Sequence, residues 1–197
     1  MGNTCLFLQR MKESSSKMIL SSEELSVIFH RICCQLLEAH EDFKNSALIG
    51  LQPRGVIFAR RIQHILQDSY GIKDLRYGEL DTTFFRDDFR LREAPLNPNQ
   101  TAIDFLVEDA KVIFLDDVLF TGRSVRAAMD AVLSFGRPAR IELVALIDRR
   151  FHRDLPVQAN IIGKRIDSIN EERVVVEWKE QSGKDQVILT QTPRKDG

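Results

Sequence analysis

The sequence has few cysteines and no long apolar run, and each shortage excludes a class of protein. Its 197 residues include 3 cysteines, Cys5, Cys33 and Cys34, with no Cys-x-x-Cys pair and no spacing typical of metal ligands. This pattern argues against a disulfide-stabilised secreted domain and a zinc site, and it favours reduced thiols. No segment approaches the roughly 20 apolar residues of a membrane-spanning helix, and the apolar run 5–8 is too short for a signal peptide. We therefore expect a cytoplasmic protein without a membrane partner.

An excess of charge of one sign is also missing. The sequence has 28 Lys and Arg against 29 Asp and Glu, a formal net charge of −1, which excludes a protein that coats nucleic acid through general positive charge. With 43% apolar and 29% charged residues, the composition is that of a folded globular domain and not of a disordered chain. A local basic surface remains compatible with this balance.

Short apolar runs alternate with segments of helical periodicity. Runs suited to strands buried on both faces of a sheet occur at 47–51, 111–115 and 141–147. Helical spacing occurs at about 22–40, 56–70 and 123–135. This order predicts an α/β fold, with a mainly parallel central sheet flanked by helices. Because ligands bind at the carboxyl ends of the strands in such sheets, we expect function in the loops 52–55, 116–124 and 148–153.

The segment 116–124 has the most informative chemistry. Asp116 and Asp117 end an apolar run, and Thr121, Gly122 and Ser124 then open a helix. A helix start with a glycine offers free N–H groups and a favourable dipole to a phosphate. Carboxylates would repel that phosphate, but they suit the hydroxyls of a sugar, so the segment predicts a site for a ribose phosphate. The alternative is an acidic loop with ordinary capping by Thr121, which leaves the paired aspartates unexplained.

Two common nucleotide-binding motifs are absent from the sequence. It contains no Gly-x-x-x-x-Gly-Lys-Ser/Thr string, which a P-loop requires. It also lacks Gly-x-Gly-x-x-Gly after the first predicted strand, which a dinucleotide-binding fold requires. The predicted phosphate site therefore belongs to neither of these classes.

In five ordered segments the sequence resembles the PyrR family of type I phosphoribosyltransferases. The segments are 51–55, 78–88, 116–130, 146–149 with 152–156, and 162–164. Members of this family attenuate pyrimidine operons and also have uracil phosphoribosyltransferase activity. The resemblance implies the type I phosphoribosyltransferase fold, a mainly parallel central sheet flanked by helices with a small hood. We expect a loosely ordered extension at 1–18 and a phosphoribosyltransferase domain at 19–190, with the hood at about 149–190.

The resemblance also implies roles for individual residues toward phosphoribosyl pyrophosphate (PRPP). Asp116 and Asp117 would bind the ribose hydroxyls, Arg54 and Gly55 would form the pyrophosphate loop 52–55, and Arg86 with the segment behind it would cover PRPP. The 5′-phosphate would bind to the phosphate loop, which consists of Val118, Leu119, Phe120, Thr121, Gly122, Arg123 and Ser124. Catalysis would fall to Asp116, Asp117, Arg54 and Arg86. Mg²⁺ would arrive as the PRPP complex, without a dedicated metal site on the protein.

The base is expected to be uracil, bound under the hood near Arg149 and Ile162. Purine-specific relatives commonly have an aspartate just before Thr-Gly, where this sequence has Phe120. An apolar ring cannot interact with a purine ring proton in that way, which favours a pyrimidine, although packing would also explain a phenylalanine there. The expected reaction is pentosyl transfer from PRPP to uracil, giving UMP and diphosphate, in pyrimidine salvage. The family suggests a homodimer or a higher homo-oligomer.

Several departures from the family pattern concern RNA binding. The attenuators usually have Lys-Thr where Gln52-Pro53 stand, a histidine where Cys34 stands, and one residue fewer in 148–152. Losing a lysine weakens phosphate attraction, which dominates RNA affinity. The remaining RNA-binding candidates are His30, Arg31, His152, Arg153 and Lys164. Two alternatives to the uracil enzyme therefore stay open: a UMP-sensing, RNA-binding attenuator of pyrimidine genes, and a phosphoribosyltransferase for another base.

Overall fold

The computed structural model describes residues 16–85, 100–168 and 172–191. The chain divides into two compact units, a larger one of Ser26–Asp167 and a smaller one of Met1–Leu25 with Ser168–Gly197. Residues 1–15 lie outside the described residues, so the expected loose extension at 1–18 stays a prediction, although Lys17 and Met18 lie in a strand. The expected bounds of the domain and of the hood likewise stay predictions.

The larger unit is built on a five-stranded parallel sheet with the order β3-β2-β4-β5-β6. Its strands are β2 (Ser46–Leu51), β3 (Arg76–Leu80), β4 (Lys111–Leu119), β5 (Arg140–Arg150) and β6 (Ile161–Asp167). The three apolar runs of the sequence form β2, β4 and β5, the central strands, which confirms the predicted α/β fold. These strands are almost wholly buried because helices cover both faces of the sheet.

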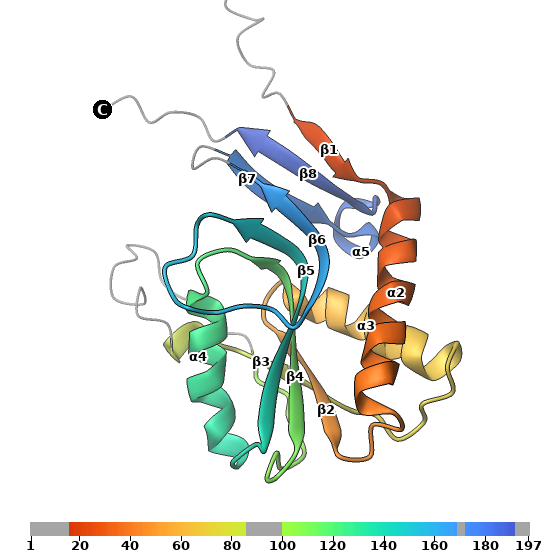
Figure 1. Cartoon of the computed structure of the whole chain (residues 1–197), viewed down its shortest axis with the longest axis vertical. Coiled ribbons are helices and arrows are strands. Elements are labelled where there is room, and N and C mark those ends of the chain that lie inside the picture. Colours follow the sequence, from red (N-terminus) through yellow and green to blue (C-terminus); the bar gives the residue numbers. More distant parts are fainter. Residues whose placement is uncertain (1–15, 86–99, 169–171, 192–197) are drawn as a thin grey trace, which may run out of the picture. The chain divides into compact units, whose positions relative to one another are not determined.

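Helices pack on the two sides of this sheet, as Figure 1 shows, with α4 on one side and α3 on the other. Helix α3 (Gly55–Asp68) follows β2 directly and packs on β2 and β4, and α4 (Arg123–Val132) follows β4. Two 3₁₀ turns complete the unit, η2 (Thr83–Phe85) and η4 (Leu133–Phe135). The buried faces of α4 and the sheet form one cluster that includes Ile49, Leu51, Phe114, Val125, Ala128 and Leu143.

The smaller unit contains a three-stranded antiparallel sheet with the order β1-β8-β7. Its elements are β1 (Lys17–Leu20), β7 (Glu172–Glu177), the short helix α5 (Lys179–Ser182) and β8 (Gln186–Gln191). Trp178 and Val187 are buried there. Helix α2 (Ser22–His40) begins in this unit with a capping box, since Glu24 accepts from the Ser21 N–H at 2.8 Å and Ser21 accepts from the Glu24 N–H at 3.3 Å. Within the described residues no helix combines the length and the apolar character that crossing a bilayer requires.

Candidate active site

Strand β4 places two aspartates near the carboxyl edge of the central sheet. We expected the loop to begin at Asp116, but β4 continues to Leu119 because its pairing with β5 extends from Lys111↔Arg140 to Leu119↔Asp148. Strand β5 likewise runs to Arg150, past the end of its apolar run. Asp116 and Asp117 are therefore held by strand geometry and not by a loop, which fixes where their side chains point.

The two carboxyl groups differ in what they contact. An Asp116 Oδ1 accepts a hydrogen bond from the Asp117 N–H at 3.0 Å, and an Asp117 Oδ1 accepts one from the Val118 N–H at 2.8 Å. The Oδ2 atom of Asp117 is buried and has no hydrogen-bond partner among the described parts of the chain. A buried carboxylate oxygen without a partner is costly, and a ligand hydroxyl would satisfy it.

Burial raises the pKa of both carboxyl groups. For Asp116, whose pKa is well above its usual value of 3.8, loss of solvation is the largest cause and the charge of Asp117 adds to it. Burial also raises the pKa of Asp117, while the nearby Arg54 cation acts in the opposite direction on both groups. Without a ligand, ionising this pair therefore costs free energy, which hydroxyl donors would offset.

The raised pKa gives a prediction about stability. A folded-state pKa above the unfolded value means that the folded state binds more protons, so the stability of the wild type falls as the pH rises from about 4 through the raised pKa. The substitution Asp116→Asn keeps an acceptor for the Asp117 N–H and removes the buried charge. We expect its Tm to exceed the wild-type Tm at pH 7, by about 2–4 °C for each kcal/mol of stability gained when the charge is removed. The difference should vanish near pH 4. Thermal unfolding from pH 4 to pH 8 measures this, and a variant less stable than wild type at pH 7 would contradict it.

The phosphate loop turns directly from β4 into α4. Gly122 is the N-cap residue of α4 and has φ 89°, in the left-handed region that favours glycine. A cavity of about 130 Å³ opens here, far more than one water needs, and its lining includes Asp116, the loop residues 118–122, Ser124 and Val125. Because N–H groups at the start of a helix attract anions, this cavity suits a phosphate, and its lining also includes Asp116.

The pyrophosphate loop lies against the same strand. It runs from Gln52 to Gly55 between β2 and α3, and Arg54 is the exposed N-cap residue of α3. A Cβ added at Gly55 would lie within 3.0 Å of the Leu115 carbonyl oxygen and 3.1 Å from the Asp116 Cα. The structure therefore brings Arg54 and Gly55 beside the two aspartates. Arg86 lies outside the described residues, so its role stays a prediction.

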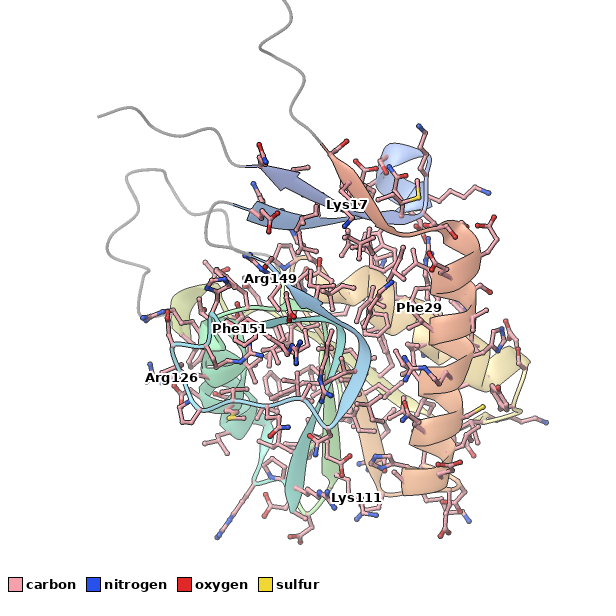
Figure 2. All side chains as sticks on the ribbon, turned by 45° about the horizontal axis from the view of Figure 1, so that its top comes forward. Lys17, Phe29, Lys111, Arg126, Arg149 and Phe151 are labelled. Atoms are coloured by element: carbon pink, nitrogen blue, oxygen red, sulfur yellow. The ribbon has the colours of Figure 1, made fainter. Side chains whose placement is uncertain are left out.

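Arg149 and Phe120 stack on one another where β5 ends. The Arg149 Cζ lies 4.0 Å from the centroid of the Phe120 ring, and the His152 ring meets the same phenylalanine edge-on at 5.6 Å between centroids. Figure 2 shows Arg149 and Phe151 at the end of the sheet opposite to Lys111, where β4 begins. Ile162, the other predicted uracil-binding residue, lies on the neighbouring strand β6 and pairs there with Ala145 of β5. Arg149 and Ile162 thus lie on β5 and β6, of which only β5 pairs with β4.

The RNA-binding candidates have different surroundings. Arg31 donates to the carbonyl oxygens of Ile162 at 3.2 Å and Gly163 at 2.5 Å, so its guanidinium is engaged with β6. Arg153 is bonded to Asp148 and to the Phe120 carbonyl. His30 is exposed and meets Tyr70 edge-on. His152 and Lys164 are half-buried, and both have further interactions. The partners of Arg31 and Arg153 could not be predicted from the sequence, since only the tertiary fold brings these residues together.

The fold and these loops define the chain as a phosphoribosyltransferase-domain protein. A family model for the phosphoribosyl transferase domain matches residues 15–181. Among solved structures, the chain is similar to a hypoxanthine phosphoribosyltransferase of Staphylococcus aureus, with a TM-score of 0.66 at 17% identity over 100% of both chains. It is also similar to that of Trypanosoma cruzi in complex with IMP, with a TM-score of 0.68 at 14% identity over 92% of this chain and 96% of the other. At such identities the likeness shows the fold, which confirms the prediction of a type I phosphoribosyltransferase.

Sequence relatives narrow the class. The chain is 39% identical to the bifunctional protein PyrR of Chloroflexus aurantiacus over 89% of this chain and 95% of that protein. It is 40% identical to that of Caldicellulosiruptor bescii, over 90% and 97%. A pyrimidine operon regulatory protein of Lactococcus lactis is 40% identical over 81% and 88%. The chain belongs to the PyrR family of phosphoribosyltransferases, as its sequence segments indicated.

Proposed function

We propose that this chain transfers the phosphoribosyl group of PRPP to uracil, forming UMP and diphosphate. The observation that supports this most strongly is the cavity beside β4, whose lining combines the start of α4 with the half-buried Asp116. A ribose 5-phosphate presents the two kinds of group that this lining suits, a phosphate and a pair of adjacent hydroxyls. In this proposal the phosphate loop binds the 5′-phosphate, and Asp116 and Asp117 accept from the ribose hydroxyls.

The proposed reaction needs alignment and charge stabilisation more than covalent chemistry by the protein. The C1′–oxygen bond to pyrophosphate breaks with its electron pair leaving on pyrophosphate. A uracil ring nitrogen forms the new bond to C1′, and its proton passes to water or to a pyrophosphate oxygen. Arg54, the N-cap residue of α3, would stabilise the charge that develops on pyrophosphate. The carboxylates of Asp116 and Asp117 favour the electron-poor ribose, and holding both reactants in line lowers the entropic cost.

Mg²⁺ would enter this site on the substrate. Of the residues that the structure describes, no three or more His, Cys, Asp and Glu side chains form a group that could hold a metal ion. The pair Asp116 and Asp117 fits an ion that takes most of its ligands from PRPP oxygens and water, as Mg²⁺ prefers. When bound, the ion neutralises part of the pyrophosphate charge.

The proposed preference for uracil depends on the surroundings of Phe120. Its ring is 37% exposed and contacts Arg149 on its face and His152 at its edge. No carboxylate stands at this position, so a purine ring proton would have no acceptor there. Ile162 is half-buried on β6 and its carbonyl oxygen already accepts from Arg31, so its role toward uracil stays a prediction.

A panel of bases tests this proposal. The purified protein is mixed with PRPP and Mg²⁺ and with uracil, orotate, hypoxanthine or guanine, and nucleotide formation is followed. We expect UMP from uracil, with a kcat/KM at least about 100-fold above those of the other bases, since a missing hydrogen-bond match is discriminated strongly. Turnover of hypoxanthine or guanine at the rate of uracil would contradict the base assignment and favour the alternative of another base.

A second candidate function is UMP-sensing RNA binding, which the names of the bifunctional and operon-regulatory relatives favour. The candidate contacts are His30, Arg31, His152, Arg153 and Lys164. Filter binding with the chain's own pyrimidine-operon leader, with and without UMP, tests it. Binding that UMP strengthens at moderate salt supports regulation, and equal, salt-sensitive binding to unrelated RNA of the same length would count against it.

A further inference from the structure

Arg153 lies between the end of β5 and the phosphate loop. One nitrogen of its guanidinium donates to Asp148 Oδ1 at 2.5 Å, and the other donates to the Phe120 carbonyl oxygen. The Asp148 carboxylate is itself buried, and the Arg153 side chain is 23% exposed. A planar guanidinium held by a buried carboxylate has few alternative positions, so the Phe120 carbonyl is held in turn.

The segment that follows Arg153 holds the next peptide group. The N–H groups of Asp154 and Leu155 both donate to the Thr121 carbonyl oxygen, at 3.1 and 3.2 Å. Two successive carbonyls of the phosphate loop are therefore bonded to residues 153–155. In a trans peptide the N–H points opposite to the C=O, so the N–H groups of Thr121 and Gly122 point away from this segment.

Two more contacts join the segment after Arg153 to the phosphate loop. The Arg123 Nε donates to Asp154 Oδ2 at 3.0 Å, and a Cβ at Gly122 would lie 3.2 Å from the Val157 Cβ. The segment 153–157 thus supports the phosphate loop through contacts to the four successive residues 120–123. Thr121 and Gly122 both line the cavity, so their N–H groups are available to a bound anion there.

We propose that Arg153 is a positioning residue that holds the phosphate loop in its anion-binding conformation. This proposal rests on the proposed function, because it concerns the same ribose-phosphate site. Arg153 acts through the Phe120 carbonyl and touches no substrate. Without it, the Phe120–Thr121 peptide group can rotate, and the loop must be ordered when the phosphate binds, which lowers affinity.

The test uses direct binding of ribose 5-phosphate and of UMP by calorimetry, together with KM for PRPP and kcat. The variants are Arg153→Met, Arg153→Lys and, as a matched control, Arg165→Gln. The Nε of Arg165 also faces Asp148, at 3.7 Å, but Arg165 is exposed and supports no loop carbonyl in the described structure. We expect Arg153→Met to weaken both ligands and to raise KM for PRPP about tenfold or more, because a net hydrogen bond to a charged group and the loop order are both lost. The Kd of uracil should change little.

The lysine variant separates positioning from attraction by charge. A lysine keeps the charge but cannot present two fixed donors to Asp148 and to Phe120, so we expect Arg153→Lys to stay several-fold weaker than wild type and Arg165→Gln to resemble wild type. Full rescue by lysine, or an equal loss in Arg165→Gln, would overturn the proposal in favour of general electrostatics. If Arg153→Met does not fold, Asp148→Asn, which frees the guanidinium, should give the same loss of phosphate affinity.

The failure of this proposal can be told from failure of the proposed function. Wild-type protein that binds ribose 5-phosphate but uses a base other than uracil would refute the base assignment and leave the Arg153 comparison intact. Wild-type protein that binds neither ribose 5-phosphate nor UMP would overturn both. Wild-type affinity in Arg153→Met would overturn the positioning role alone.

Discussion

The substitution Asp117→Asn is expected to lower kcat/KM for phosphoribosyl transfer by about 10²–10³-fold. The Oδ2 atom of Asp117 is buried and lacks a partner in the described structure, whereas Oδ1 is occupied by the Val118 N–H. A ribose hydroxyl that donates to Oδ2 would gain a charge-assisted hydrogen bond in a dry site. Asparagine places a donor in that position, which removes both the acceptor and the negative charge beside the electron-poor ribose.

Steady-state kinetics with PRPP and uracil measure this effect, and Asp68→Asn at the exposed end of α3 is the matched control. The control makes the same change of charge away from the site and should keep wild-type activity. Burial raises the pKa of Asp117, so its replacement should not reduce stability at neutral pH, and a loss of activity would then reflect chemistry and not unfolding. A wild-type rate in Asp117→Asn would remove this residue from the mechanism.

The substitution Gly55→Ala is expected to impair folding and catalysis together. The added methyl group would clash with the Leu115 carbonyl oxygen and lie 3.1 Å from the Asp116 Cα, and both of these atoms belong to backbone that cannot easily move. Such overpacking costs about 1–3 kcal/mol, which for a chain of this size lowers Tm by several degrees. The start of α3 would also move away from β4 and take Arg54 with it. Since a displacement of about 1 Å can cost 10²-fold in rate, we expect kcat/KM to fall by about that factor.

Gly71→Ala provides the control for this substitution. Gly71 has φ 73°, so alanine there must adopt a left-handed backbone conformation, which costs about 1–2 kcal/mol of stability. Nothing lies within 4 Å of its added methyl group. The control should therefore lose stability while keeping wild-type kinetics. Thermal unfolding and kinetics of both variants separate the two effects, and equal activity in Gly55→Ala and wild type would show that α3 need not abut β4 for catalysis.

The sequence predicted the parts of the fold that local chemistry determines. Apolar runs at 47–51, 111–115 and 141–147 became the central strands because a strand covered by helices on both faces has no polar face to maintain. The capping box at Ser21 placed the start of α2 correctly for the same local reason. The predicted ends of β4 and β5 were wrong, because the two strands continue to pair through polar residues such as Asp116 and Asp148.

The residues of the candidate site that are contiguous in the sequence could be predicted. Those that meet only when distant segments pack together could not. Asp116 to Ser124 form a continuous stretch, so their chemistry could be inferred in order. The partners of Arg153 could not, because Asp148 and Phe120 reach it only after β4 and β5 pair. Its basic side chain led to the prediction of an RNA contact, which stays a prediction, and the structure adds two partners within the protein. Charge alone does not indicate whether a basic side chain binds a ligand or another residue.

The most direct test of this account is calorimetric titration of the wild-type protein with PRPP in saturating Mg²⁺. The account predicts saturable binding at one site per chain, weakened in Asp117→Asn and competed by UMP, because one cavity beside β4 receives the ribose and phosphate of both molecules. No saturable heat from either PRPP or UMP at millimolar concentration would contradict the claim that residues 116–124 bind a phosphorylated ribose.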